Sequence, residues 1–143
     1  MNEGFMPSTD EYDQIFPAEV HAIIPPLYTS EENPDPLVVM KFFTPDTNWT
    51  WYIIEGSPVD ENGDVLQSDP SNDVQAVDFQ FFGLVDGIET ELGYISLNEL
   101  RTIRGPLGLP IERDEHWKPR SLSEVESIIT SLKSQGQNSA PIA

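Results

Sequence analysis

Hydrophobic side chains recur with a helical period near the start of the chain and with a period of two further on. Residues 17–24 have apolar positions at helical spacing, with Pro17 in the first turn and Pro25 after the last, which predicts a short helix. After a polar, proline-bearing stretch the period becomes two, which is typical of strands. The four predicted strands cover residues 37–43, 49–55, 77–85 and 89–95.

The first two predicted strands are joined by good turn residues, so they should form an antiparallel hairpin. With Thr44 and Asn48 flanking the turn, Lys41 is expected opposite Trp51. Both faces of the strand over residues 49–55 are largely apolar, which predicts a central strand that is covered on both sides.

Two capping boxes mark the helices of the C-terminal part. Ser96 and Glu99 open a short helix, and Ser121 and Glu124 open a second one with an apolar stripe, while the residues between the two helices have no usable period. The predicted fold is α+β, a four-stranded, mostly antiparallel sheet with a short N-terminal helix and two C-terminal helices, the helices lying against one face. The expected organisation is a mobile acidic tail over residues 1–12, a single domain over 13–133 and a disordered tail over 134–143.

Charge is divided unevenly along the chain. The first hundred residues hold 20 acidic side chains and one basic one, whereas the last 43 hold 5 acidic and 6 basic ones; these blocks of −19 and +1 give the net charge of −18. Direct binding to DNA, RNA or an anionic membrane is disfavoured, because each phosphate contact needs a cation. A basic protein surface, such as that of a nucleic-acid-binding protein, is the expected partner, and mutual repulsion favours a monomer. Solubility, or adaptation to a salty cytoplasm, is the alternative explanation of the acidity.

The acidic side chains expected to face such a partner lie in the turn-rich segment 56–76, which contains the tight turn Asn62-Gly63 and no Lys or Arg. They are Asp60, Glu61, Asp64, Asp69 and Asp73. The run is similar to a calcium loop but lacks the EF-hand spacing, so it is interpreted as a solvated turn and no metal site is predicted.

No catalytic residue and no cofactor is predicted. The sequence has no cysteine and none of the nucleophile-elbow, zinc-protease, Walker or dinucleotide-binding motifs. Nucleophilic catalysis needs a base oriented by a third group, and the chain offers only His21 and His116. His116 follows two acidic residues and could serve as an acid or base, but one histidine beside acids is common by chance. The first residues lack the basic and apolar regions of a signal peptide, and no apolar run approaches the roughly 18 residues of a membrane span. The expected location is the cytoplasm.

The alternative to an interaction protein is a small ligand-binding module or enzyme. Its site would combine Lys41, Trp49, Trp51, Glu89, Glu91, Arg104, Arg113 and His116. In that case a lysine beside indole rings, and carboxylates beside arginines, would converge on a concave pocket. Otherwise the tryptophans belong to the core, Lys41 reaches solvent or pairs with Glu55, and the other acids pair with the arginines in a structural network.

Three segments of the chain share the pattern of a known family. They are Lys41-Phe42-Phe43-Thr44-Pro45-Asp46 through Trp49-Thr50-Trp51-Tyr52 to Glu55-Gly56; Phe81-Phe82-Gly83 with Gly87, Glu89, Glu91 and Gly93-Tyr94; and residues 104–114. In this order they resemble the bacterial domain-of-unknown-function family 2958. The resemblance implies a small protein of plasmids, phages and other mobile elements, and it carries over no activity. The chain departs from the family pattern after Asp114, where Glu115 and His116 precede Trp117.

Charge, missing catalytic motifs and this resemblance lead to one hypothesis. The sequence predicts a non-enzymatic, DNA-mimic-like interaction protein of mobile elements. Its acidic side would bind a basic surface of a nucleic-acid-binding or defence protein, and the affinity should fall steeply with salt, because exposed charges are screened within about 8 Å at physiological ionic strength.

Overall fold

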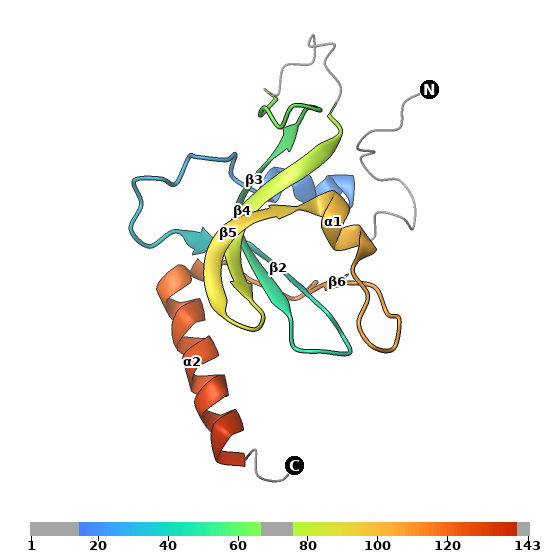
Figure 1. Ribbon diagram of the computed structural model, residues 1–143. Coiled ribbons are helices and arrows are strands. Elements are labelled where there is room, and N and C mark those ends of the chain that lie inside the picture. The colour runs from blue at the N-terminus through green and yellow to red at the C-terminus, as the bar shows by residue number, and fades with distance from the viewer. Residues whose placement is uncertain (1–14, 67–75, 140–143) are drawn as a thin grey trace.

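The computed structural model describes residues 15–66 and 76–139 (Figure 1). The fold is α+β, as predicted, and consists of a mostly antiparallel sheet with helices packed on it. In chain order the elements are the 3₁₀ helix η2 (Ala18–Ile23), β1 (Leu37–Val38), β2 (Met40–Phe43), β3 (Thr50–Val59), β4 (Asp78–Asp86), β5 (Thr90–Ser96), α1 (Leu97–Thr102), β6 (Glu112–Arg113), β7 (Arg120–Ser121) and α2 (Leu122–Ser139).

The main sheet has five strands in the order β5-β4-β3-β2-β6, so the prediction of four strands is wrong. The additional strand, β6, has only two residues and pairs antiparallel with β2 at the edge of the sheet. It lies in the proline- and glycine-bearing stretch that shows no period, and a two-residue strand is too short to display one.

The predicted strand 37–43 is two strands with different partners. Its first part, β1, pairs with β7 to form a separate two-stranded sheet, whereas its second part, β2, pairs with β3 and β6. At the break, the Val39 N–H donates a 2.8 Å hydrogen bond to the carbonyl of Ile53. The chain therefore stays hydrogen-bonded to β3 while it changes from one sheet to the other.

The register of the β2–β3 hairpin differs by one residue from the predicted register. Thr44 pairs with Trp49 rather than Asn48, because the Thr44 N–H donates to the Trp49 carbonyl and the Thr44 hydroxyl accepts from the Trp49 N–H. As a result Lys41 lies opposite Tyr52, and Trp51 lies opposite Phe42. A one-residue slip moves a side chain to the other face of the sheet. Lys41 and Trp51 are thus on opposite faces.

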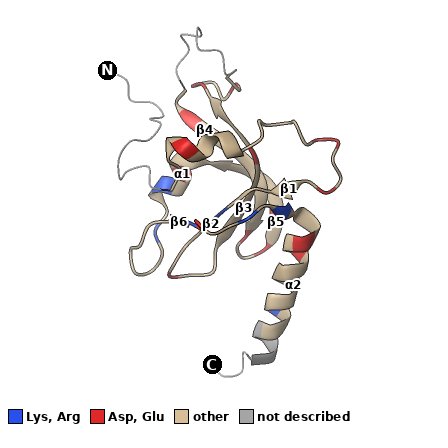
Figure 2. Cartoon of the chain, turned by 180° about the vertical axis from the view of Figure 1, so that it is seen from behind, with Lys and Arg blue, Asp and Glu red and all other residues tan. Residues whose placement is uncertain are grey.

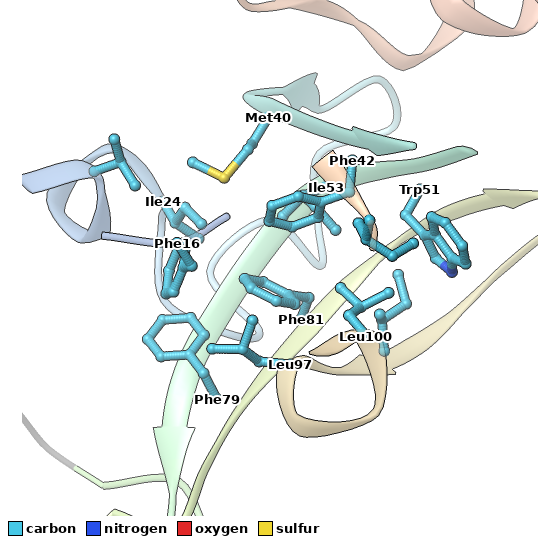
Figure 3. Packing of buried hydrophobic residues seen from close by; sticks show 13 residues of the cluster. Phe16, Ile24, Met40, Phe42, Trp51, Ile53, Phe79, Phe81, Leu97 and Leu100 are labelled. Atoms are coloured by element: carbon cyan, nitrogen blue, oxygen red, sulfur yellow. The ribbon is translucent and has the colours of Figure 1, made fainter. Parts of the chain in front are cut away.

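Strand β3 is central and buried on both faces, as predicted. On one face its residues Trp51 and Ile53 belong to a core cluster with side chains from η2 and α1 (Figure 3). On the other face Tyr52 and Ile54 pack with residues of α2. The prediction that all helices lie against one face is therefore wrong, because alternation along β3 offers two apolar faces and each must be covered.

Both capping boxes open helices as the sequence predicts. The hydroxyl of Ser96 accepts a hydrogen bond from the Glu99 N–H, and the hydroxyl of Ser121 accepts one from the Glu124 N–H. Helix α2 is longer than expected and continues to Ser139, since each residue added to an established helix contributes one more backbone hydrogen bond. Its C-terminal half extends away from the sheet (Figure 1). The tail expected over residues 1–12, and residues 140–143 of the other tail, lie outside the described residues.

Candidate functional site

The eight residues of the predicted ligand site do not converge. Trp49, Trp51 and Arg104 line a groove on the α1 face of the sheet, whereas Lys41 and His116 line a hollow on the α2 face. The other three lie on strands or in the β4–β5 turn and line neither, namely Glu89, Glu91 and Arg113. The reason is the hairpin register, which places Lys41 and Trp51 on different faces.

The groove on the α1 face has a volume of about 490 Å³ and is formed by the β2–β3 turn and the residues after α1. The rings of Trp49 and Trp51 stack with centroids 5.9 Å apart. Trp51 is buried and belongs to the core, while Trp49 is 37% exposed. The Arg104 guanidinium donates 2.9 Å hydrogen bonds to the carbonyls of Arg101 and Ile103, so it caps the end of α1.

The loop after α1 is attached to the β2–β3 turn through Asp46. The Asp46 carboxylate accepts a 2.7 Å hydrogen bond from the Leu107 N–H, and its other oxygen is buried without a donor among the described residues. Gly105 lies against the same carboxylate, since a Cβ there would be 1.8 Å from its oxygen. The loop thus forms one wall of the groove at a fixed position.

The hollow on the α2 face is built around Trp117, a residue that sequence reasoning did not include. Its indole N–H donates a 3.0 Å hydrogen bond to the Val38 carbonyl. The Lys41 ammonium lies 5.7 Å from the Trp117 ring centroid and 4.0 Å from the Asp114 carboxylate. Asp114, rather than Glu55, is therefore the carboxylate that pairs with Lys41.

The expected pairing of Glu89 and Glu91 with arginines is not found within the described residues, where both glutamates are exposed. The strand register explains this, because Arg113 and Glu91 occupy the two edges of the sheet. Four interstrand spacings separate them, which amounts to about 19 Å at roughly 4.8 Å per spacing. A direct ion pair across that distance is excluded.

The most buried carboxylate of the described chain belongs to Glu55, which is 4% exposed. Glu55 accepts hydrogen bonds from the Tyr28 N–H (2.8 Å) and the Ser30 N–H (2.6 Å), and a third from the Ser30 hydroxyl. Strict alternation would place Glu55 on the face of Ile53. A bulge between the two residues moves it to the opposite face, in register with Phe82.

A cavity of about 310 Å³ lies beside Glu55, between the loop after η2 and the β4–β5 part of the sheet. Rings of Tyr28, Phe82 and Tyr94 line it, and the last two are in contact with centroids 5.2 Å apart. Burial raises the pKa of the Tyr94 hydroxyl, and the negative charges of Tyr28, Glu55 and Glu31 raise it further. The sequence signal for this site was a lone carboxylate in an apolar strand.

A family model described as "Protein of unknown function (DUF2958)" matches residues 17–131, which is most of the chain. The chain belongs to this family. The resemblance inferred from the three sequence segments is thereby confirmed. Neither the curated proteins nor the solved structures contain a match to the chain.

The three segments of this DUF2958 protein meet in the fold. Asp46 of the first segment binds the backbone of Leu107 in the third, and Glu55 of the first pairs in register with Phe82 of the second. Among the residues that the structure describes, no group of three His, Cys, Asp or Glu side chains is arranged to hold a metal ion. No helix in that part of the DUF2958 chain has the length and apolar character to cross a membrane.

The acidic residues of this DUF2958 protein lie at several edges of the molecule (Figure 2). At the far end of β3, the Asp60 carboxylate accepts hydrogen bonds from the N–H groups of Asn62 and Asp64, and Gly63 adopts a φ of +85°, so the predicted tight turn is confirmed. Asp69 and Asp73 lie outside the described residues. All seven Lys and Arg residues lie elsewhere, on β2, α1, α2 and the segment between the two α-helices.

Proposed function

We propose that this DUF2958 protein is a non-enzymatic, cytoplasmic interaction protein of mobile elements that engages a basic surface of a nucleic-acid-binding or defence protein. The observation that supports this function best is the charge of the β3–β4 end. Glu61 and Asp64 are exposed there, Asp60 is partly exposed, and no basic side chain accompanies the three among the described residues. We call these three residues the acidic turn.

The negative charge of the acidic turn favours a partner with a positively charged surface. Carboxylates at the surface with no basic neighbour create a negative potential that attracts a basic surface and accelerates its association. The same potential repels nucleic acid and anionic membranes, and the net charge of −18 favours a monomer.

The amount of charge is compatible with imitation of a nucleic acid. A DNA duplex presents about 20 phosphates per 34 Å turn. The first hundred residues carry 20 carboxylates, and a compact domain of this length spans roughly 35–40 Å. An acidic protein of this density can occupy a cleft that otherwise binds DNA, which makes the DNA-mimic-like function the specific form of the proposal.

The experiment is capture of partners from the native host at low salt, elution with a salt step, and a competition assay of each purified partner against a labelled DNA duplex. The test variant carries Asp60→Asn, Glu61→Gln and Asp64→Asn. The matched control, with Glu89→Gln, Glu91→Gln and Glu126→Gln, changes the net charge equally at exposed positions elsewhere on the protein. Only the test variant should lose affinity and show a weaker salt dependence. An affinity that does not change between 50 and about 500 mM salt contradicts the proposal, because screening weakens every exposed charge pair over that range.

A ligand-binding module or enzyme is the second candidate, and the groove beside Trp49 is the observation that favours it. The groove has the size of a small-molecule site, and an aromatic face is exposed in it. A fragment screen followed by tryptophan fluorescence tests this candidate. A ligand of the groove should quench the fluorescence of the wild type and should not bind Trp49→Ala. If every fragment binds Trp49→Ala as well as it binds the wild type, the groove is not a ligand site.

A further inference from the structure

Glu55 is a buried carboxylate with no counter-ion among the residues that the structure describes. No Lys or Arg is among the described residues that line the cavity beside it, and none forms an ion pair with it. Transfer of a carboxylate out of water is costly unless the charge is paired or well hydrogen-bonded. Three hydrogen bonds offset part of that cost, and they leave acceptor capacity on Oε1, which accepts only the bond from Tyr28.

The walls of the cavity suit a cation with an apolar stem. Tyr28 and Tyr94 are 50% and 57% exposed at its rim, and Leu92 adds an exposed apolar side chain. Aromatic faces attract ammonium and guanidinium groups through the ring quadrupole. Glu31, which is exposed, is a second carboxylate in the lining, so the cavity has one buried and one exposed negative side chain.

The backbone at the rim is held in an unfavourable conformation by the same carboxylate. Tyr28 has a φ of +74°, the left-handed region that residues with a Cβ rarely adopt, and its N–H donates to Glu55. Such strain persists only where surrounding contacts impose it, and it concentrates at binding sites. Glu55 therefore both carries the charge and positions one of the aromatic rings around it.

We propose that the cavity beside Glu55 binds an alkylammonium or alkylguanidinium group, of the kind that a lysine or arginine side chain of a protein partner carries. The cation lies against Tyr28 and Tyr94, approaches Glu55 Oε1, and its alkyl stem contacts Leu92. The inference rests on the proposed function for the source of the cation, since a basic partner surface supplies such side chains. The site is a different one from the acidic turn.

The test uses the methylamides of Nα-acetyl-lysine and Nα-acetyl-arginine as probes, with the neutral norleucine and citrulline analogues as matched controls. Amide NMR titration of the full chain should show saturable shifts at Tyr28, Ser30 and Tyr94 with the cationic probes alone. Equal shifts with the neutral analogues, or no saturable shift in the cavity, overturn the proposal.

Two variants locate the binding. Glu55→Gln keeps the shape and removes the charge, and it should weaken probe binding at least about tenfold. Tyr94→Ala alters an exposed side chain and leaves the carboxylate in place, so it keeps the test valid if Glu55→Gln does not fold. Tyr94→Ala should weaken the binding of the cationic probes about two- to fivefold, as expected for the loss of one cation–π contact. Probe binding that is unchanged in Tyr94→Ala contradicts the proposal.

Failure of this inference and failure of the proposed function give different results. The triple substitution in the acidic turn leaves the cavity residues intact. Saturable probe binding that persists when no basic partner is found refutes the proposed function and supports the site. Absence of probe binding refutes the site, whatever a partner does at the acidic turn.

Discussion

Gly83 of β4 and Gly93 of β5 pair directly across the antiparallel register, yet only Gly93 has room for a side chain. A Cβ on Gly83 would lie 2.0 Å from the backbone carbonyl oxygen of Tyr52, whereas a Cβ on Gly93 would meet nothing within 4 Å. The difference arises beside the bulge of β3, where the backbone of the central strand approaches β4 closely.

Substitution of these two glycines should therefore have unequal effects. Gly83→Ala should lower the free energy of unfolding by about 1–3 kcal/mol, because a backbone atom cannot move away as the end of a side chain can. Gly93→Ala, the matched control, should stay within about 0.5 kcal/mol of the wild type. Urea denaturation followed by circular dichroism measures both, and equal midpoints for the two variants would contradict the close approach.

Asp46 should be the attachment point of the loop after α1. Asp46→Ala removes the acceptor of the Leu107 N–H, so hydrogen exchange at that amide should accelerate and stability should fall by about 1 kcal/mol. Asp46→Asn retains an acceptor oxygen and should lose less. If the Leu107 amide exchanges at the same rate in the wild type and in Asp46→Ala, the loop is held by other contacts.

Lys41 should be coupled to Asp114 and not to Glu55. The ammonium and carboxylate are 4.0 Å apart and both are partly exposed, so a double-mutant cycle with Lys41→Met and Asp114→Asn should give a coupling energy below about 1 kcal/mol. The coupling should shrink in 1 M salt, where the Debye length is about 3 Å. A parallel cycle of Lys41→Met with Glu55→Gln serves as the control and should give no coupling energy. A coupling energy larger than that of Lys41 with Asp114 would refute the assignment of the ion pair.

The stability of α2 should depend on pH through Asp35. Hydrogen bonds from the Ser123 hydroxyl and N–H lower the pKa of the Asp35 carboxyl. A group whose pKa is lower in the folded state stabilises that state above its unfolded pKa of about 3.9, and the contribution is lost as the pH falls through the folded value. The difference in Tm between the wild type and Asp35→Ala should thus be largest near pH 7 and disappear toward pH 2. Glu126→Gln, a control at an exposed position of α2, should show no such dependence of the Tm difference on pH. A Tm difference for Asp35→Ala that does not change with pH would exclude ionisation of the Asp35 carboxyl as its cause.

Elements with a complete local signal could be predicted from the sequence. Both α-helices begin where Ser96 and Ser121 accept capping hydrogen bonds, since the cap and the apolar stripe lie within a few residues of each other. The central position of β3 followed from its two apolar faces, which depend only on side-chain alternation.

Features that depend on a distant partner could not be predicted. Strand β6 exists because the edge of β2 offers it hydrogen bonds, and its own two residues carry no pattern. The bulge after Ile53 reverses the faces of the strand, so Glu55 leaves the side that alternation assigns to it. The hairpin register depends on which turn residue pairs with Thr44, and the structure pairs it with Trp49 through both its backbone N–H and its hydroxyl, which puts Lys41 and Trp51 on opposite faces.

Strand β3 supplies side chains to both core clusters at once, and this has a consequence for how the molecule unfolds. Trp51 and Ile53 cannot leave one cluster without Tyr52 and Ile54 leaving the other, because all four are consecutive on one backbone. Unfolding of the cluster on one side of the sheet is therefore coupled to unfolding of the cluster on the other side, because both contain side chains of the same strand. Denaturation should be an all-or-none event, with no stage in which one layer melts while its counterpart stays native.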